Sequence, residues 1–362
     1  MMIKKLVSLL AVTLIMPYVF YASDQRECKN TFYESSPSYA RDCDGEKKHE
    51  MVFAAFAENE EQKYHTLILA ESIRTFSGKF RNAPIWIYLP ENLFQVEDAT
   101  QKKMSSMGVD VKISQAPAEA LDFYFARKVF ASAKAEAEAE GKTEILVWMD
   151  EDTVVLKEPQ DFMLGPGVSF GYRPVTHKRI GSLYSEPPDE FWSRMYQKLS
   201  VPEDSIFPMS TVADKKIIRP YFNAGLLVVR PERGILRKWG ESFTTLYEDP
   251  ALVEMCHQDI DKKIFIHQVA LAGAMLKLLK REEMVEFSRL FNYPLFFNEL
   301  FDSEEKFDSI DGVITLRYDV LFRNPPPDWS QKLKGPSEII SWLKERFEKK
   351  TNEHPLQPGL SH

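Results

Sequence analysis

Two carboxylates at the end of an apolar run are the residues of this sequence best suited to chemistry. Five apolar residues, 145–149, are followed directly by Asp150, Glu151 and Asp152. An uninterrupted apolar run of this kind predicts a strand that is buried on both faces. Side chains alternate along a strand, so we expect Asp150 and Asp152 on one face and Glu151 on the other. Paired carboxylates suit a hard divalent cation, Mg²⁺ or Mn²⁺.

A simpler interpretation is that these acids only mark where a strand reaches solvent, because short motifs often occur by chance. The surrounding pattern favours a functional site. In open α/β sheets, ligands bind beyond the carboxyl ends of the strands, which is where these acids stand.

The rest of the chain predicts an alternation of strands and helices. The expected strands are 51–56, 84–88, 109–113, 145–149, 167–172, 226–229 and 313–316. The expected helices are 60–76, 95–107, 121–140, 189–199, 231–247, about 258–279 and 337–349. Such alternation predicts parallel strands with helices on both faces. On the helix at 121–140, Phe125 is expected on the buried face, and Glu136, Glu138 and Glu140 on the solvent face.

Composition excludes several classes of protein. A chain of 362 residues with 44% hydrophobic residues can bury a large core. Its net charge of −8 argues against nucleic acid as a partner, since no basic excess is present to neutralise phosphates. The sequence has no C-x-x-C zinc pattern, no serine nucleophile elbow and no His-Glu-x-x-His motif.

The N-terminus, residues 1–23, predicts a secretory signal peptide. Lys4 and Lys5 precede an apolar segment from Leu6 to Phe20. We therefore expect export through the secretory pathway, to the periplasm or medium in a bacterium and to a lumen in a eukaryote. An uncleaved membrane anchor is the alternative. Residues 24–50 form a polar lead-in, 51–330 the main domain, and 331–362 a C-terminal helix and tail.

Three cysteines give limited information. Cys28 and Cys43 could pair in an oxidising compartment, or remain two thiols of the lead-in. Cys256 is expected to be buried and unreactive.

The order of these features resembles the GT-A nucleotide-diphosphosugar transferases, and most closely the glycogenin-like enzymes of family 8. A long helix carries Arg127, an apolar strand runs into Asp150-x-Asp152, and Phe222-Asn-Ala-Gly225 leads into another apolar strand. The resemblance covers about residues 51–322. It implies an α/β, GT-A-like (Rossmann-like) fold, with a mixed, mostly parallel sheet flanked by helices on both faces. It also implies a hexosyltransferase that moves a sugar from a nucleotide diphosphate sugar to an unknown glycan, protein or lipid acceptor.

The resemblance also implies roles for individual residues. Asp150 and Asp152 would hold Mn²⁺ or Mg²⁺, which offsets the charge that grows on the leaving nucleoside diphosphate. Asn223 would bond sugar hydroxyls and take part in catalysis. The implied donor-binding set is Ala54, Ala55, Phe56, Arg127, Asp150, Glu151, Asp152, Asn223, Ala224 and Gly225.

Three of these assignments have simpler alternatives. Arg127 could reach the diphosphate, since guanidinium suits phosphate oxygens, or be a surface charge. The small residues near Ala54 could line the nucleoside, or allow tight packing of a helix on the sheet. His267 and Gln268 fall at an acceptor-side or catalytic position of the family, but a histidine in an apolar helix is also typical of a core.

One departure from the family concerns the metal. Its members supply a late histidine as a further ligand, and this chain has none near its last strand. Asp319 could act as the missing ligand, or Arg317 could replace the metal's charge at the phosphate. The rival function is a sugar- or glycan-binding protein that keeps the GT-A-like fold without turnover.

Overall fold

The computed structural model describes residues 48–95, 98–295, 298, 301, 306–318 and 329–353, and the side chains of these residues as far as 347. All of them belong to the compact unit that spans Lys47–His362. The predicted signal peptide, Cys28, Cys43 and Asp319 lie outside the described residues.

A seven-stranded sheet, ordered β10-β6-β9-β4-β1-β2-β3, forms the centre of this unit. Strands β1, β2, β3 and β4 pair in parallel, and β9 is antiparallel to both of its neighbours. The predicted mixed, mostly parallel sheet is confirmed. The strands are β1 (His49–Phe56), β2 (Ile85–Leu89), β3 (Val109–Ile113), β4 (Thr143–Met149), β6 (Phe170–Pro174), β9 (Phe222–Val229) and β10 (Met284–Glu286).

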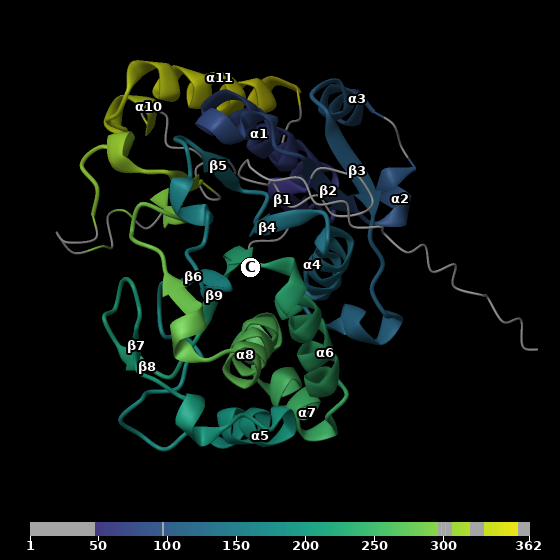
Figure 1. Ribbon diagram of the computed structural model, residues 1–362, viewed down its shortest axis with the longest axis vertical. Coiled ribbons are helices and arrows are strands. Elements are labelled where there is room, and N and C mark those ends of the chain that lie inside the picture. The colour runs from purple at the N-terminus through teal and green to yellow at the C-terminus, as the bar shows by residue number, and fades with distance from the viewer. Residues whose placement is uncertain are drawn as a thin grey trace, which may run out of the picture. The chain divides into compact units, whose positions relative to one another are not determined.

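Helices cover both faces of the sheet, as Figure 1 shows. They are α1 (Glu60–Phe76), α2 (Glu91–Phe94), α3 (Ala99–Ser106), α4 (Ala126–Ala139), α5 (Glu190–Leu199), α6 (Ile235–Tyr247), α7 (Pro250–Gln258), α8 (Ile260–Leu278), α10 (Trp329–Lys332) and α11 (Ser337–Glu353). Among the described residues, no helix is both long and apolar enough to cross a membrane.

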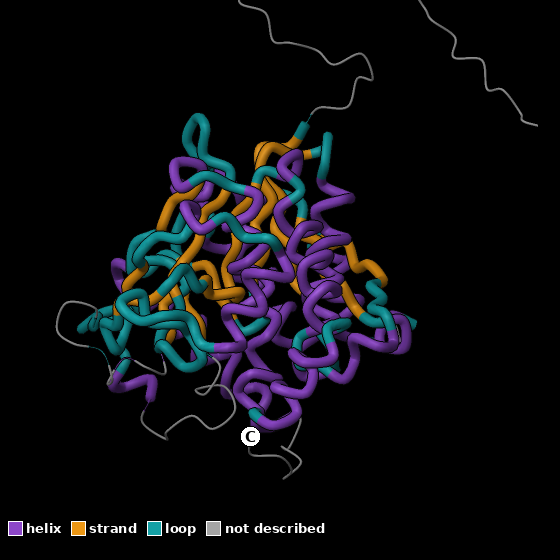
Figure 2. Tube along the Cα trace, turned by 90° about the horizontal axis from the view of Figure 1, so that it is seen from below, coloured by secondary structure: helices purple, strands orange, loops and turns teal. Residues whose placement is uncertain are grey.

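The alternation of side chains along the buried strands separates two hydrophobic layers. In β4, Leu146 and Trp148 pack with α4, α5, α6 and α8, whereas Ile145, Val147 and Met149 pack with α1 and α3. In the perpendicular view of Figure 2, helices (purple) lie beside the strands (orange) of the described unit. Helix α11 packs on the outer side of α1 (Figure 1).

Two small sheets complete the fold. One has the order β11-β12-β5, from β11 (Tyr293–Pro294), β12 (Thr315–Arg317) and β5 (Thr153–Val155). The other pairs β7 (Met209–Ser210) with β8 (Ile217–Ile218). In the first sheet, Arg317 stands opposite Thr153 in an antiparallel register. This pairing brings the late strand to the residues that follow β4.

The predicted helix at 121–140 is wrong at its start. The chain forms a short 3-10 helix, Ala118–Asp122, and α4 begins only at Ala126. Phe125 has a left-handed backbone with φ of 63°. Its side chain is exposed rather than on the expected buried face. An aromatic residue rarely adopts this conformation, so the apolar periodicity gave no sign of the break.

Glu136 also differs from the prediction, because it is fully buried instead of facing solvent. Helix α6 receives no side-chain hydrogen bond from its own N-cap, Gly234. The carboxylate of Glu136 accepts the backbone N–H of Arg237 at 2.8 Å and caps α6 from outside.

Other differences concern the bounds of elements. The predicted helix at 95–107 is α2 and α3 with a break between them, and α7 precedes α8 where one helix was expected. Asp259 ends α7 and caps α8, accepting the N–H groups of Asp261 and Lys262. The strand expected at 167–172 runs over 170–174.

Candidate functional site

The two aspartates at the end of β4 each contact a basic side chain. Lys128 of α4 forms an ion pair with Oδ1 of Asp150. Arg317 of β12 donates to Asp152 from two nitrogens, Nε to Oδ1 at 3.1 Å and an Nη to Oδ2 at 2.8 Å. The same Arg317 Nη lies 3.7 Å from Oδ2 of Asp150. Four side chains from β4, α4 and β12 thus form one cluster, which we call the ion-pair cluster.

The fold explains how the two cations reach the acids. Helix α4 packs against β1 and β4 and starts just past the left-handed Phe125, so Lys128 lies in its first turn. The Lys128 ammonium lies 5.6 Å from the centre of the Phe125 ring. Only 10% of the Lys128 side chain is exposed. Arg317 is placed by the pairing of β12 with β5, and the N–H of Tyr318 donates to the carbonyl of Asp152 at 3.0 Å.

The pKa values of Asp150 and Glu151 are shifted in opposite directions. Burial alone would raise the pKa of Asp150, but the charges of Lys128 and Arg317 outweigh it and lower that pKa. Burial, together with the Asp152 and Asp150 carboxylates, raises the pKa of Glu151 to about 8. The cluster therefore favours the ionised form of Asp150 and the protonated form of Glu151.

Asn223 and Gly225 join the cluster from β9. The N–H of Gly225 donates to Oδ1 of Asn223 at 2.8 Å, and the N–H of Asp150 donates to the carbonyl of Gly225 at 2.9 Å. A Cβ added at Gly225 would stand 2.7 Å from Oδ2 of Asp150 and 3.0 Å from Oδ1 of Asn223. The absence of a side chain at Gly225 therefore lets the Asp150 carboxylate and the Asn223 amide lie close together at the end of β4.

Asn292 supports this arrangement and was not predicted from the sequence. Its Nδ2 donates to Oδ1 of Asn223 at 3.2 Å, and its backbone N–H donates to Oγ1 of Thr315 at 2.6 Å. Its φ is 52°, a left-handed value that asparagine tolerates better than most residues. Asn292 is buried, and its Oδ1 has no hydrogen-bond partner among the described residues.

His267 of α8 lies next to Phe125, the residue that precedes α4. It is buried, its Nδ1 lies 2.8 Å from the carbonyl of Ile264, and its ring centre is 4.6 Å from that of Phe125. Burial and the nearby charge of Lys128 lower the pKa of His267 to about 3, so the imidazole is neutral. Gln268 is half-buried and points about 100° away around the helix.

Arg127 lies apart from the ion-pair cluster. Its Nε is 3.3 Å from Oε1 of Glu58. Its side chain lines a cavity of about 480 Å³ at the ends of β2 and β3, together with polar residues that include Asn92, Ser114 and Gln115. The structure thus places Arg127 by an open polar cavity, where it is neither fully exposed nor in contact with the aspartates.

The small residues at the end of β1 are buried within the sheet. Ala54 and Phe56 face the layer that contains Trp148, and Ala55 faces the opposite layer. Ala224 is buried in β9. The tight-packing role of these residues is thus visible, and their contact with a nucleoside stays a prediction.

The residues present do not fit a divalent cation in this arrangement. All four carboxylate oxygens of Asp150 and Asp152 face Lys128 or Arg317. Among the described residues, no group of three or more His, Cys, Asp or Glu side chains is placed to hold a metal. Two basic residues occupy the positions in which a metal would meet the carboxylates.

Lys128 was missed because one lysine in a helix carries no signal in a single sequence. Its importance depends on where α4 begins, which is set by the left-handed Phe125. Asn292 was missed because it lies in an irregular segment whose place depends on β11 and β12. Arg317 was singled out in the sequence as a possible substitute for the metal's charge, and it does contact both aspartates.

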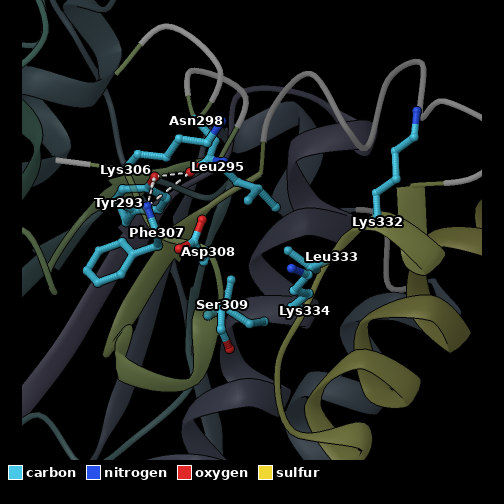
Figure 3. Close-up of a pocket in the computed structure, with 11 residues that line it drawn as sticks. Tyr293, Leu295, Asn298, Lys306, Phe307, Asp308, Ser309, Lys332, Leu333 and Lys334 are labelled. Atoms are coloured by element: carbon cyan, nitrogen blue, oxygen red, sulfur yellow. Dashed lines mark hydrogen bonds between the residues drawn. The ribbon is translucent and has the colours of Figure 1, made fainter. Parts of the chain in front are cut away.

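A second cavity, of about 230 Å³, lies between the segment around β11 and the end of α10 (Figure 3). The backbone N–H of Phe307 lies 3.3 Å from the Tyr293 hydroxyl and 3.4 Å from Oδ1 of Asn298. The Lys332 ammonium points away from these groups in Figure 3. None of the predicted site residues lines this cavity, so it is separate from the ion-pair cluster.

Comparison with known structures finds matches of low sequence identity that cover most of the chain. The structure of the galactosyltransferase LgtC with donor and acceptor sugar analogues is 15% identical, with a TM-score of 0.43, and covers 85% of this chain and 98% of that chain. The apo form of mouse xyloside xylosyltransferase 1 is 11% identical, with a TM-score of 0.41, and covers 75% of this chain and 98% of that one. A comparison with curated proteins finds no match.

A family model gives the assignment. Residues 53–278 match the model described as the Rhodobacterales glycosyltransferase domain. This range contains Lys128, Asp150, Asp152 and Asn223, and it ends before Arg317. Because the match spans more than half of the 362 residues, the chain belongs to the family of Rhodobacterales glycosyltransferase domains.

Proposed function

We propose that the chain transfers a sugar from a nucleotide diphosphate sugar to a hydroxyl group of a glycan, protein or lipid acceptor. The family establishes a glycosyltransferase; the donor and acceptor classes are the proposal. In the reaction, the bond between the anomeric carbon and the β-phosphate oxygen breaks, and its electron pair leaves with the nucleoside diphosphate. The acceptor oxygen forms the new bond to the anomeric carbon, and the hydroxyl proton passes to solvent or to a base.

One observation carries this proposal. An ionised carboxylate, an amide and two cations converge beside Gly225, at the end of β4. The carboxylate of Asp150 and the amide of Asn223 suit sugar hydroxyls, which both donate and accept hydrogen bonds. The cations suit a diphosphate. A nucleotide sugar combines these two requirements, and it is a donor that suits a glycosyltransferase.

Individual roles follow from this arrangement. Asn223 orients the donor sugar, and Asn292 fixes the Asn223 amide. Arg127 and its polar cavity are assigned to the nucleoside side of the donor, since guanidinium and polar side chains suit a nucleotide. In this proposal His267 lies on the acceptor side as a neutral hydrogen-bonding group, because its pKa is about 3. Gln268, which points about 100° away around α8, has no role in it.

Thermal unfolding of the full chain against a panel of nucleotide sugars tests this function. A donor at about a hundredfold over its Kd should add about 2.7 kcal/mol of stability. Each stabilising donor is then incubated with the protein, and release of the nucleoside diphosphate is measured with and without Mn²⁺ or Mg²⁺. The metal assistance expected from the sequence is thereby tested in the same experiment.

Asn223→Ala gives a sharper readout than the wild type alone. It should weaken donor binding, while Asn298→Ala, which changes an asparagine of the second cavity, should leave binding unchanged. Stabilisation by glycans with no response to any nucleotide sugar would overturn the transferase proposal in favour of glycan binding. Donor binding without release of the diphosphate, for every acceptor class tried, would favour a binding protein that has lost turnover.

The predicted signal peptide adds a proposal about location. We propose export through the secretory pathway, which places the site in the compartment where its acceptor must be found. Mass determination of the N-terminus of the protein purified from its own cells tests cleavage, which is expected near residue 23. An intact N-terminus on protein from the membrane fraction would identify the uncleaved anchor, and an intact N-terminus on protein from the cytosolic fraction would contradict export.

A further inference from the structure

We infer that Lys128 and Arg317 supply, at the donor diphosphate, the positive charge that a divalent metal supplies in a metal-dependent transferase, so that donor binding does not require a metal. This inference rests on the proposed function, because it concerns the same diphosphate. It gives the two aspartates a different role, which is to hold the two cations.

The charges of the cluster support this inference. Asp150 and Asp152 carry two negative charges, and Lys128 and Arg317 carry two positive charges. One divalent cation between two aspartates would give the same sum. The cluster therefore reproduces the charge balance of a metal site with side chains alone.

The geometry of Arg317 fits the role of a fixed charge. It donates to both oxygens of Asp152 in a bidentate pair, which is the strongest arrangement of a guanidinium on a carboxylate. The same group lies 3.7 Å from Asp150. A guanidinium carries several N–H donors in a planar fork, a geometry that suits phosphate oxygens as well as carboxylates.

Lys128 is held just as firmly. Its side chain is 90% buried, with its ammonium near the Phe125 ring and paired with Asp150. Burying a charged lysine is costly unless it is paired. The chain meets this cost at the point where a metal would bind, although an uncharged residue would pack more easily in the first turn of α4. An ammonium has three donors, and the Asp150 contact uses one of them.

The two readings of the site predict opposite effects for one substitution. If Asp150 and Asp152 bind a metal, Asp150→Asn removes a ligand and weakens donor binding. If they hold the cations, Asp150→Asn removes the anionic partner of the Lys128 ammonium, which can then pair with a phosphate instead. Binding of a diphosphate should then be kept or become tighter.

The experiment measures binding of UDP, GDP, ADP and CDP to the full-length protein by calorimetry, first in excess EDTA and then with Mn²⁺. We expect one nucleoside diphosphate to bind in EDTA, with a Kd that Mn²⁺ changes by less than about threefold. Lys128→Met and Arg317→Met should each weaken this binding by about 10- to 100-fold in EDTA, as expected for a lost charge-assisted hydrogen bond. Lys128→Arg, which keeps the charge, should restore most of the affinity, and Arg317→Lys, which keeps the charge but loses the bidentate pair, should restore part of it.

Matched controls separate this effect from a change in net charge or folding. Lys134→Met removes an exposed lysine of the same helix, and Arg233→Met an exposed arginine that pairs with Glu283. Both should bind as the wild type does. Each variant is first checked for a cooperative unfolding transition, and the Lys128→Arg and Arg317→Lys forms keep the test open if a methionine form does not fold.

The outcomes are distinct. Binding that appears only with Mn²⁺ and is abolished by Asp150→Asn would overturn this inference and leave the proposed function intact. Binding in EDTA that is indifferent to Lys128→Met and Arg317→Met would also overturn it. No binding of any nucleoside diphosphate, with or without Mn²⁺, would overturn both the inference and the proposed function.

Discussion

Glu136 offers a direct test of how α4 is fixed to α6, and so of how Lys128 is positioned. Its carboxylate is fully buried and accepts the backbone N–H of Arg237. Burial raises its pKa from 4.5 to about 6, although the N–H groups of α6 and the Arg237 guanidinium act in the opposite direction. The cost of burying the charge thus exceeds what the cap returns.

The sign and size of the effect follow from this shift. The native pKa lies above the unfolded value, so the protonated form is favoured in the native state. The stabilisation from Glu136 is complete below about pH 4.5 and is lost as the pH rises through about 6. A rise in pKa from 4.5 to about 6 corresponds to about 2 kcal/mol of free energy of unfolding.

The assay compares urea unfolding of the wild type and Glu136→Gln between about pH 4 and about pH 7. An amide oxygen can still accept the Arg237 N–H, and it carries no charge at either pH. The free energy of unfolding of the variant should therefore rise by about 2 kcal/mol relative to the wild type over this interval. The difference between the two proteins removes the contribution of other groups, such as His267, whose lowered pKa makes stability fall as the pH drops.

Glu140→Gln is the matched control, since Glu140 bonds the same Arg237 from an exposed position on the chain. A Glu136→Gln difference that stays constant with pH would refute the reasoning. So would an equal pH dependence in Glu140→Gln, since the effect would then belong to Arg237 and not to burial.

Three further predictions concern the site, stability and reactivity. Gly225→Ala should weaken nucleoside diphosphate binding more than it lowers the midpoint of thermal unfolding, because its Cβ would push away the still-charged Asp150 carboxylate and with it the Lys128 ammonium that is paired to it; unchanged affinity by calorimetry would contradict this. Asp249→Ala should lower the free energy of unfolding by about 3 kcal/mol, because this buried acid pairs with Arg194 and caps α7; a loss under about 1 kcal/mol in urea unfolding would count against it. Cys256 should react with a thiol reagent no faster than the protein unfolds when the other two cysteines are replaced by serine, since burial raises the pKa of this thiol to about 12; rapid labelling of the native protein would show that the thiol is accessible.

Much of the fold could be predicted because it depends on local patterns. The buried strands β1, β2 and β4 are continuous apolar runs, and α1 has clear helical spacing with Asn59 as its cap. Such signals depend on neighbours within a few residues of one another. The predicted strand at 109–113 and helix at 60–76 agree with β3 and α1 at both ends.

The errors share a different cause. The start of α4 depends on a left-handed phenylalanine, and the burial of Glu136 depends on α6, which lies about a hundred residues away in the chain. Neither is visible in a window of one sequence, because the partner that stabilises the unusual state is distant. Tertiary contacts override local preference at such positions.

The features of the candidate site likewise fall into those that depend on local sequence and those that depend on distant contacts. The sequence alone predicted Asp150 and Asp152, because acids after a buried strand are a local feature with a chemical meaning, and the family resemblance added Asn223 at the entry to another strand. It also determined the glycosyltransferase class, which the family confirms. Only the tertiary structure decided what those acids contact. Lys128 precedes Asp150 by 22 positions, and Arg317 follows Asp152 by 165, so their ion pairs exist only after α4 packs on β4 and β12 pairs with β5. Charge acts over a few ångströms in space and not along the chain, so the fold places two cations where the sequence predicted a metal.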